Sequence, residues 1–452
     1  MTTVDRSILE LFEDLQFSDE DIRPKLKFLL NNKFSYQELE FHLHTKGNLL
    51  RKNLELARLH KALADTALFA GEKDKSKKFI VKALNFVKEE VKLSVNQLES
   101  LSLSDSLTSL QRTQVNLPVR IDLAGGWTDT PPYSLEKGGK VLNLAILLDG
   151  RAPISAQIRP VSEQIIRMKS VDQNNQKTIS KDELNITEFD LTDPFCLTHN
   201  ALLSNEELIR SDSAGMEVET NCVVPMGSGL GTSSILAASL IKALWSYYGQ
   251  TEEEERLLNQ VLLVEQMMGA GGGWQDQVGG IVPGLKITST QSGVPQRFDI
   301  KKIKLPSNIQ SELEKRLVLI YTGQQRIAKN ILEVVVLKWL SRDIELVKTL
   351  ELMPENVESA KDSILAGDFI EFGKQLTWYF EAKKVLNPNT TNKKIEYLVS
   401  RFQDLCDGWC IAGAGGGGFM MFLLKENSDK FFFDKLISET GITHHKWSFA
   451  DW

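Results

Sequence analysis

The sequence predicts an α+β protein of two or three domains with a helical region on its N-terminal side. Residues 1–110 contain only two glycines and one proline, and their apolar residues recur at helical spacing. From Gln114 onward, strand-like segments alternate with helical ones, and a second pattern of this kind begins after about residue 310. A chain of 452 residues is also too long for one compact core.

The predicted elements divide the chain into three parts: 1–110, 111–310 and 311–452. In the first part, Gly71 predicts a turn before a long amphipathic helix, and the serine-rich stretch 100–114 predicts a linker. The second part is expected to contain strands at 116–124, 141–148, 153–159, 164–171 and 216–224, and helices at 233–248 and 252–268. The third part, after a boundary near 300–315, is expected to contain strands at 316–321, 409–412 and 418–424, helices near 325–340, 355–366, 368–384 and 391–406, and a terminal helix.

The composition is that of an ordinary globular protein, with 42% hydrophobic and 25% charged residues. A net charge of −7 argues against a general nucleic-acid binder. No stretch approaches about 18 apolar residues, and the first residues lack the pattern of a signal peptide, so we expect no membrane partner. The cysteines lack metal-ligand spacing with histidine and are typical of reduced packing thiols, which predicts a cytoplasmic protein.

The strongest chemical signal is a glycine-rich stretch, "PMGSGLGTSS", between a predicted strand and a predicted helix. Glycines let backbone N–H groups approach an anion, and a helix N-terminus adds free donors and a positive dipole end. Hydroxyl groups there can cap the helix, bind phosphate or reach Mg²⁺. The lysine of the common P-loop is missing, so this is another kind of phosphate loop or, alternatively, a flexible loop with a capped helix. The candidate ATP-binding residues are Pro225, Gly227, Ser228, Gly229, Leu230, Gly231, Thr232, Ser233 and Ser234.

A second glycine run, at 412–418, matches the G-x-G-x-x-G pattern of dinucleotide-binding proteins only formally. That pattern needs a helix after the glycines, whereas Phe419–Leu424 is predicted to be a strand. The run is better explained as a tight loop between strands that approaches the ligand of another domain. Its candidate residues are Gly413, Gly415, Gly416 and Gly417.

Two carboxylates accompany a third glycine-rich stretch, "LLVEQMMGAGGGWQDQVGG". Glu265 lies on a predicted helix, and Asp276 is expected in the loop that follows, between Gln275 and Gln277. Asp276 could be an ordinary surface turn residue. Together with a phosphate loop, however, the pair suggests that Glu265 ligates Mg²⁺ with a loop hydroxyl and that Asp276 accepts the proton of an attacking hydroxyl.

A fourth stretch, "PVRIDLAGGWTD" at 118–129, ends a predicted strand on two glycines. It places Arg120, Asp122 and Asp129 around the glycine pair, with Trp127 beside them. Surface turns rarely need a large aromatic residue, and cores rarely contain three charges. The combination therefore predicts a polar site with one apolar wall.

The order of these motifs resembles that of the GHMP kinases, the family of galactokinase, homoserine kinase, mevalonate kinase and phosphomevalonate kinase. The resemblance covers roughly residues 114–452 and rests on "PVRIDLAGGWTD", "PMGSGLGTSS" and "AGAGGGG". It implies a two-lobed α+β kinase fold that uses ATP and Mg²⁺. The N-terminal lobe is expected to be similar to ribosomal protein S5 domain 2 and to bind ATP and sugar, and the C-terminal lobe to be ferredoxin-like.

The resemblance also implies roles for individual residues. The segment "WQDQ" is similar to the catalytic segment of the sugar kinases in this family, so Asp276 takes the role of the base. Arg120 falls on the motif arginine beside the base, where it can stabilise charge on the transferring phosphoryl group. Asp129 falls on the aspartate that binds sugar hydroxyls. Ser233 falls on the Mg²⁺-binding serine, with Glu265 as its partner and the neighbouring Ser234 as a stand-in.

Within the family, "RIDLAGGWTDTPP" and the helical N-terminal part resemble the kinase portion of bifunctional fucokinase/GDP-fucose pyrophosphorylases. This implies transfer of phosphate from ATP to the anomeric hydroxyl of L-fucose, in fucose salvage toward GDP-fucose. Asp122, Gly126, Trp127 and Asp129 are then the candidate substrate-binding residues. We see no nucleotidyltransferase signature, so the GDP-fucose pyrophosphorylase domain is expected to be missing or separate.

Gly126 and Trp127 hold positions that a glutamate and a histidine occupy in galactokinase-like sequences. Because fucose is a 6-deoxy sugar, the change is explained if the Trp127 indole meets its methyl group. Alternatively, Trp127 stacks on the ring face or only supports the loop. Two other functions also stay open: a kinase of another sugar, such as a heptose phosphate, and a non-catalytic sugar sensor.

Overall fold

The computed structural model describes residues 26, 52–96, 111–185, 193–211, 214–225, 227–268, 271–293, 295–324, 328–428, 430–440 and 442–450. Most of the predicted serine-rich linker at 100–114 and nearly all of residues 1–51 lie outside this part of the chain. None of the helices in the described ranges is long and apolar enough to span a membrane.

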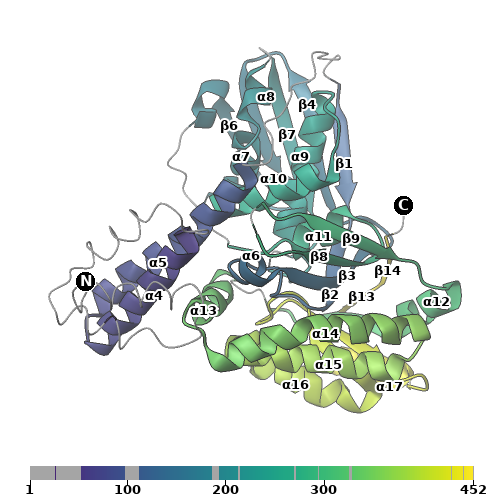
Figure 1. The fold of residues 1–452 in the computed structure, drawn as a ribbon. Coiled ribbons are helices and arrows are strands. Elements are labelled where there is room, and N and C mark those ends of the chain that lie inside the picture. Colours follow the sequence, from purple (N-terminus) through teal and green to yellow (C-terminus); the bar gives the residue numbers. More distant parts are fainter. Residues whose placement is uncertain are drawn as a thin grey trace.

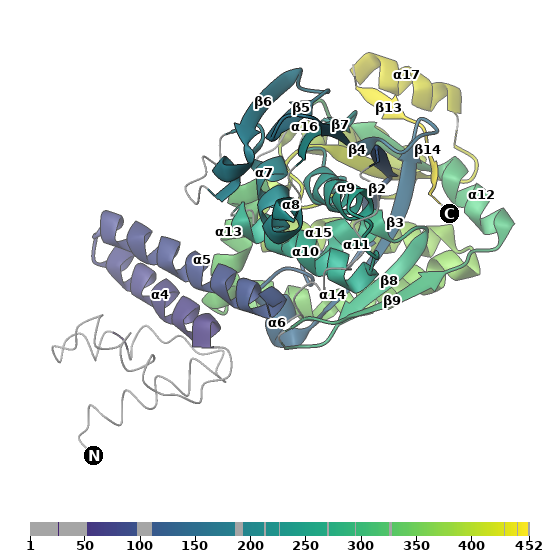
Figure 2. The same ribbon diagram turned by 90° about the horizontal axis from the view of Figure 1, so that it is seen from above.

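The described part of the N-terminal extension includes a hairpin of two helices, α4 (Lys52–Phe69) and α5 (Lys73–Asn96), which projects from one side of the molecule (Figures 1 and 2). The predicted turn between them is confirmed, because Gly71 adopts a φ of +81° that glycine tolerates better than any other residue. The base of the hairpin is fixed to the rest of the chain by apolar packing of Val87 with Leu262.

One sheet of the N-terminal lobe has the strand order β1-β4-β7-β5-β6. Its strands are β1 (Thr113–Leu117), β4 (Ile154–Val161), β5 (Ile165–Ser170), β6 (Asn175–Ser180) and β7 (Gly215–Cys222). Helix α9 (Thr232–Tyr247) packs against β1 and β4, and α7 (Cys196–Leu203) and α10 (Glu254–Met267) pack against α9. The short helix α8 (Glu206–Arg210) leads into β7.

A second sheet has the order β14-β3-β8-β9, with β2 paired to β3. Its strands are β2 (Val119–Ala124), β3 (Gly139–Leu148), β8 (Leu285–Thr290), β9 (Phe298–Ile303) and β14 (Trp447–Phe449). Helix α6 (Tyr133–Lys137) joins β2 to β3, and α11 (Gln275–Ile281) packs on β2, β3 and α9. This sheet lies across the middle of the molecule in Figure 1 and carries the motif at 118–129.

The C-terminal lobe has a third sheet, with the antiparallel order β11-β12-β10-β13. Its strands are β10 (Leu317–Tyr321), β11 (Cys406–Ile411), β12 (Phe419–Leu424) and β13 (Thr443–His445). The helices around it are α12 (Ser307–Arg316), α13 (Ala328–Leu340), α14 (Ile344–Ala366), α15 (Phe369–Leu386), α16 (Lys393–Phe402) and α17 (Lys430–Thr440). Along the chain, helices follow β10 and one helix follows β12, which is the ferredoxin-like βαββαβ order.

The two-lobed α+β fold with a helical extension is therefore confirmed. Helix α14 packs on β2 and β3, and α15 packs on both β2 and β11, so these helices join the two lobes. The division at residues 310 and 311 stays a prediction. It falls within α12, and β14, from beyond it, pairs with β3 of the middle sheet.

Several element predictions differ from the structure for local reasons. The strand expected at 116–124 is two strands that join different sheets, separated at Pro118. The helix expected at 355–366 begins at Ile344 because Asp343 caps it, accepting a hydrogen bond from the Leu346 N–H at 3.0 Å. Pro354 lies inside this helix although proline usually ends one. The strands β6, β8, β9, β13 and β14 were not predicted.

The position of α11 depends on two glycines that let it approach its neighbours closely. A Cβ atom at Gly279 would lie 2.6 Å from Cβ and Cγ of Arg120, and one at Gly280 would lie 2.4 Å from Cδ1 of Ile235. Beyond Gly279, the buried amino group of Lys286 donates hydrogen bonds of 3.0 Å to the carbonyls of Gly279 and Gly284. The helix is therefore held tightly against β2 and α9.

We predict that Gly279→Ala destabilises the protein by about 1–3 kcal/mol, the usual cost of overpacking a core. Arg120 cannot easily move away because its guanidinium is hydrogen-bonded to Asp276, Asp122 and Gly229. Urea unfolding followed by fluorescence measures the effect as a lower midpoint with an unchanged slope. An unchanged midpoint would contradict the close contact between α11 and β2.

Candidate active site

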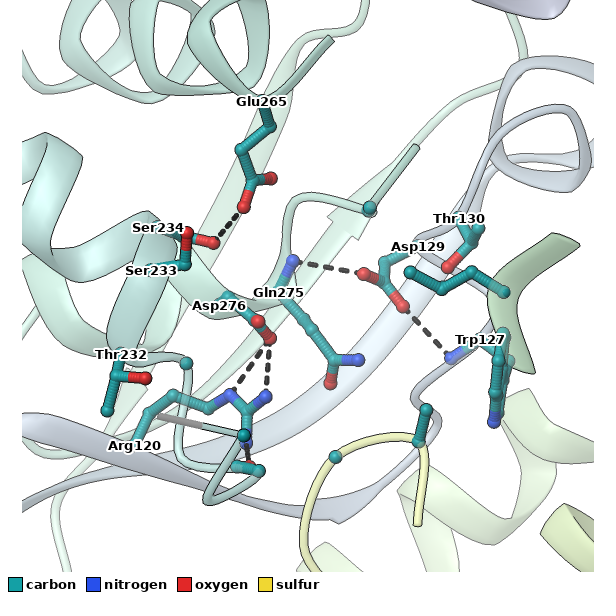
Figure 3. A pocket seen from close by; sticks show the side chains of 18 of the residues that line it. Arg120, Trp127, Asp129, Thr130, Thr232, Ser233, Ser234, Glu265, Gln275 and Asp276 are labelled. Atoms are coloured by element: carbon teal, nitrogen blue, oxygen red, sulfur yellow. Dashed lines mark hydrogen bonds and ion pairs between the residues drawn. The ribbon is translucent and has the colours of Figure 1, made fainter. Parts of the chain in front are cut away.

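All four stretches that the sequence singled out meet at one pocket of about 250 Å³, which lies between the lobes (Figure 3). It is lined by Arg120, Trp127, Asp129, Thr130, Gly227, Gly229, Gly231, Thr232, Ser233, Ser234, Glu265, Gly272, Gly273, Gln275, Asp276, Leu332, Tyr379, Gly413 and Ala414. Segments from β2, the start of α9, the end of α10, α11, α13, α15 and the loop after β11 contribute to it. The predicted base, phosphate loop and sugar-binding aspartate therefore share one cavity.

Arg120 and Asp276 form a close ion pair on the floor of this pocket (Figure 3). The Arg120 Nε and Nη2 both donate to Oδ1 of Asp276, with Nε at 3.1 Å. The sequence suggested that Asp276 lies in a loop, but it lies in the first turn of α11. Glycine is a poor helix former, but at Gly279 and Gly280 it permits the contacts that hold the helix, so packing outweighs propensity.

Asp122 lies behind Arg120 and is fully buried, with no exposed surface. Its Oδ1 accepts from Nη1 of Arg120 at 3.2 Å and from the Gly413 N–H at 2.7 Å. Its Oδ2 accepts from Nζ of Lys383 at 2.7 Å and from the Tyr379 hydroxyl at 2.9 Å. Burial opposes ionisation of this carboxyl, but Lys383 and Arg120 outweigh it and lower its pKa.

These contacts change the interpretation of Asp122, which the sequence suggested as a substrate-binding residue. It does not line the pocket, and both of its oxygens accept hydrogen bonds from protein groups of the two lobes. Asp122 therefore positions Arg120 and the loop that begins at Gly413.

Asp129 lies across the pocket from the Arg120–Asp276 pair (Figure 3). Its Oδ1 accepts from the Trp127 N–H at 2.9 Å, and its Oδ2 accepts from the Gln275 N–H at 3.1 Å. Burial raises the pKa of Asp129 to about 7. The hydrogen bond from the Gln275 N–H lowers this pKa, and the negative charge of Asp276 raises it further. A carboxyl in this state can donate or accept a hydrogen bond near neutral pH.

Glu265 comes from α10 and points at the start of α9 (Figure 3). Its Oε1 accepts from the Ser234 hydroxyl, while its buried Oε2 has no hydrogen-bond partner in the described part of the chain. Burial, and next the charge of Asp276, raises the pKa of Glu265 to about 8. The structure thus places Ser234, and not Ser233, against this carboxylate, although both serines line the pocket.

The two glycine loops fit against each other at the edge of the pocket. Gly227, Gly229 and Gly231 all have φ between +72° and +81°, which strongly favours glycine. A Cβ atom at Gly229 would lie 2.5 Å from the carbonyl oxygen of Ala412, and one at Gly418 would lie 2.2 Å from that of Ser228. The second loop thus approaches the first closely. The sequence predicted that it approaches a ligand of the other domain, and that stays a prediction.

Some predicted residues support these loops without lining the pocket. The carbonyl of Ser228 accepts from the Phe419 N–H at 2.8 Å, and the carbonyl of Leu230 accepts from the Arg120 N–H at 3.2 Å. Pro225, Gly126, Gly415, Gly416 and Gly417 likewise do not line the pocket.

Trp127 is almost completely buried and has a φ of +82°, which is unusual for a residue with a side chain. Its N–H binds Asp129, and its side chain lines the pocket while belonging to the apolar core. The neighbouring Gly126 has no room for a side chain, because a Cβ atom would lie 2.2 Å from the Tyr379 hydroxyl oxygen. Such a conformation can persist only where the surrounding structure enforces it.

Sequence reasoning missed several residues of this pocket, among them Gln275, Thr130, Leu332 and Tyr379. Gln275 precedes the candidate base directly, so its position could have suggested it. Leu332 and Tyr379 lie on helices of the C-terminal lobe and belong to no motif, so no local signal identifies them.

We predict that Asp129 makes a contribution to the stability of the metal-free and substrate-free protein that falls as pH rises from about 4 to about 7. The folded-state pKa of Asp129, about 7, lies above its usual 3.8, so the folded state binds more protons within this window. This contribution is complete below about pH 4, is lost by about pH 7, and amounts to at most about 1.4 kcal/mol per pH unit. Urea unfolding at several pH values measures it.

Asp129→Asn is the control for this pH dependence. An amide does not titrate, so the variant should lose this part of the slope, even if it is less stable at every pH. An equal slope in both proteins would contradict the raised pKa of Asp129.

The family model "GHMP kinases N terminal domain" matches residues 198–284, which include the phosphate loop and Asp276. The chain is 39% identical over 329 residues to the bifunctional fucokinase/GDP-fucose pyrophosphorylase of Arabidopsis thaliana, covering 72% of this chain and 31% of that protein. It is 34% identical over 340 residues to the L-fucokinase/L-fucose-1-P guanylyltransferase of Bacteroides fragilis, covering 72% and 36%.

The chain thus spans about a third of the length of these two curated relatives. Among solved structures, its fold is similar to that of a D-glycero-D-manno-heptose 1-phosphate kinase from Bacteroides thetaiotaomicron. That match has a TM-score of 0.59 and 20% identity, and it covers 75% of this chain and 96% of the other. The matched domain, the curated relatives and the two-lobed fold together show that the chain belongs to the GHMP kinase family.

Proposed function

We propose that this protein is an ATP-dependent sugar kinase that phosphorylates the anomeric hydroxyl of L-fucose to give L-fucose 1-phosphate. The observation that carries this proposal is the pocket in which the Arg120–Asp276 pair lies beside the glycine loop at the N-terminus of α9. A base and a phosphate-binding loop in one cavity are what phosphoryl transfer to a hydroxyl requires.

Asp276 accepts the proton of the attacking hydroxyl, whose oxygen forms a bond to the γ-phosphorus of ATP. The bond from that phosphorus to the bridging oxygen breaks, and ADP leaves with the electron pair. An anomeric hydroxyl is more acidic than an ordinary alcohol, so one carboxylate is a reasonable base. Arg120 holds Asp276 in place and supplies positive charge beside the transferring group.

The donor set around Glu265 fits a magnesium ion. Oε2 of Glu265 is buried without a partner among the described residues, and the Ser234 hydroxyl lies against Oε1. Within this part of the chain no three acidic, histidine or cysteine side chains form a metal cluster by themselves, so other ligands must come from ATP and water. A hard cation prefers such oxygen ligands together with phosphate oxygens and water. Glu265 and a hydroxyl of Ser234 or Ser233 would hold the ion, which neutralises charge on the phosphates of ATP when bound.

L-Fucose is the preferred substrate on two grounds. The two curated relatives are named fucokinases, at 39% and 34% identity. In addition, Trp127 lines the pocket, and at the neighbouring Gly126 the Tyr379 hydroxyl occupies the space that a side chain would need. An apolar wall suits the methyl group of a 6-deoxy sugar, which a hydroxymethyl group would not match as well.

A phosphorylated heptose is less well matched to this pocket. Such a substrate needs positive charge for its own phosphate in addition to the charge that serves ATP. Among the described residues, Arg120 is the one basic side chain that lines the pocket, against three carboxylates. The intact ion pair of Arg120 with Asp276 likewise favours a kinase over a non-catalytic sugar sensor.

We predict that ADP release with L-fucose exceeds that with D-arabinose by roughly 10–200-fold in kcat/KM, because D-arabinose lacks the methyl group. A coupled ADP assay with L-fucose, D-arabinose, L-galactose and D-galactose measures the order of preference. Asp276→Asn is the control and should lose about 10²–10⁴-fold in kcat, because its amide cannot accept the proton. If the wild-type protein phosphorylates none of these sugars, the proposed substrate is refuted. If Asp276→Asn keeps a near-normal kcat, the role of Asp276 as the base is refuted.

We predict that Glu265→Gln and Ser234→Ala each raise the Mg²⁺ concentration needed for half-maximal rate, because the cation loses or weakens an oxygen ligand. Titration of Mg²⁺ at saturating ATP and sugar measures the shift. Ser233→Ala is the matched comparison, and the hydrogen bond from Ser234 to Glu265 favours the larger shift for Ser234→Ala. If Glu265→Gln leaves the Mg²⁺ dependence unchanged, the metal is held elsewhere.

A further inference from the structure

The side chain of Gln275 lies in the middle of the pocket, between the Arg120–Asp276 pair and Asp129 in the view of Figure 3. We propose that its amide is a specificity-determining contact that binds the sugar hydroxyl adjacent to the one that receives the phosphoryl group. This inference rests on the proposed function and adds to it the group that recognises one particular position of the sugar.

The backbone of Gln275 is fixed from two directions. Its N–H donates to Oδ2 of Asp129 at 3.1 Å, and its carbonyl accepts from Nδ2 of Asn143 at 3.1 Å. Asn143 lies on β3 and is fully buried, so the residue is tied to the middle sheet. The start of α11 is therefore held rigidly, and the Gln275 side chain projects from a preorganised position.

Gly126 provides the space that the amide occupies. A Cβ atom at this position would lie 2.9 Å from Oε1 and 3.1 Å from Nε2 of Gln275. Any larger residue there would therefore push the amide out of its position. The glycine next to Trp127 is thus explained by two neighbours at once, the Tyr379 hydroxyl and the Gln275 amide.

The amide has no hydrogen-bond partner among the residues that the structure describes. Its Oε1 is buried and unpaired, and its Nε2 makes no hydrogen bond to any described residue. Gln275 is half-buried, and a buried carbonyl oxygen such as its Oε1 is costly to leave unpaired unless a ligand donates to it. A primary amide has one acceptor and two donor hydrogens, which suits a sugar hydroxyl, because a hydroxyl both donates and accepts.

The position of Gln275 next to Asp276 identifies the hydroxyl. Asp276 is placed to take the proton from the reacting hydroxyl, and Asp129 lies on the far side of the amide (Figure 3). A group between them faces a neighbour of the reacting carbon, which in a sugar ring is either the ring oxygen or the next carbon. The ring oxygen has no hydrogen to donate to the unpaired Oε1 of Gln275, so the hydroxyl on the next carbon is the better match. For a sugar phosphorylated at C1, this is the hydroxyl at C2.

The experiment compares kcat/KM for L-fucose and 2-deoxy-L-fucose in wild-type protein and in Gln275→Met. Methionine has nearly the same length but cannot make the amide's hydrogen bonds. Wild type should prefer L-fucose by roughly 10- to 100-fold, and Gln275→Met should lose most of this preference while KM for ATP stays unchanged. Any effect of the 2-hydroxyl on the acidity of the anomeric hydroxyl is present in both proteins and cancels in the comparison.

Gln277→Met is the matched control, because it makes the same chemical change two residues further along α11. Gln277 is fully buried and does not line the pocket, so this variant should reduce activity with both sugars alike. A 4-deoxy analogue should be discriminated equally by wild type and Gln275→Met. Thermal unfolding checks that both variants fold.

The outcomes separate this inference from the proposed function. If wild type phosphorylates none of these sugars, the proposed function fails. If wild type phosphorylates L-fucose and Gln275→Met retains the full preference over the 2-deoxy sugar, the role of Gln275 fails alone. Loss of discrimination at C4 and not at C2 would also overturn the assigned contact.

Discussion

The buried carboxylate of Asp122 is the contact on which the site depends. It binds Arg120 from β2, Lys383 and Tyr379 from α15, and the N–H of Gly413 from the second glycine loop. A buried charge is tolerated only when it is paired and fully hydrogen-bonded. Asp122 therefore has all of its hydrogen bonds only when both lobes are in place. These hydrogen bonds also hold the Arg120 guanidinium in the position from which it binds Asp276.

In front of this network, the pocket has an excess of negative charge. Asp129, Glu265 and Asp276 face one cavity in which Arg120 supplies the basic side chain. Burial raises the pKa values of Asp129 and Glu265 to about 7 and about 8, and the nearby charge of Asp276 contributes to both shifts. This imbalance is one reason for the proposal that a divalent cation binds here with ATP.

Glycines allow the backbone to pack closely against these charged side chains and so fix where the side chains lie. Gly273 leaves no space for a side chain, since a Cβ atom would lie 2.0 Å from Oδ2 of Asp129, and Gly279 gives Arg120 room against α11. Gly126 admits the Tyr379 hydroxyl and the Gln275 amide. Close approach of backbone to polar side chains, and not loop flexibility, accounts for these glycines in the motifs.

The sequence by itself determined the α+β class, the helical extension and most of the chemical groups of the pocket. Glycine loops, strand patterns and carboxylate positions are local features, so Arg120, Asp129, Glu265 and Asp276 could be found without coordinates. The tertiary structure decided what depends on contacts between distant segments. Asp122 turned from a candidate ligand-binding residue into a buried lobe contact, and Tyr379 entered the site from a helix without any motif. The physical reason is that burial and hydrogen-bond satisfaction are properties of the packed chain, which no local pattern encodes.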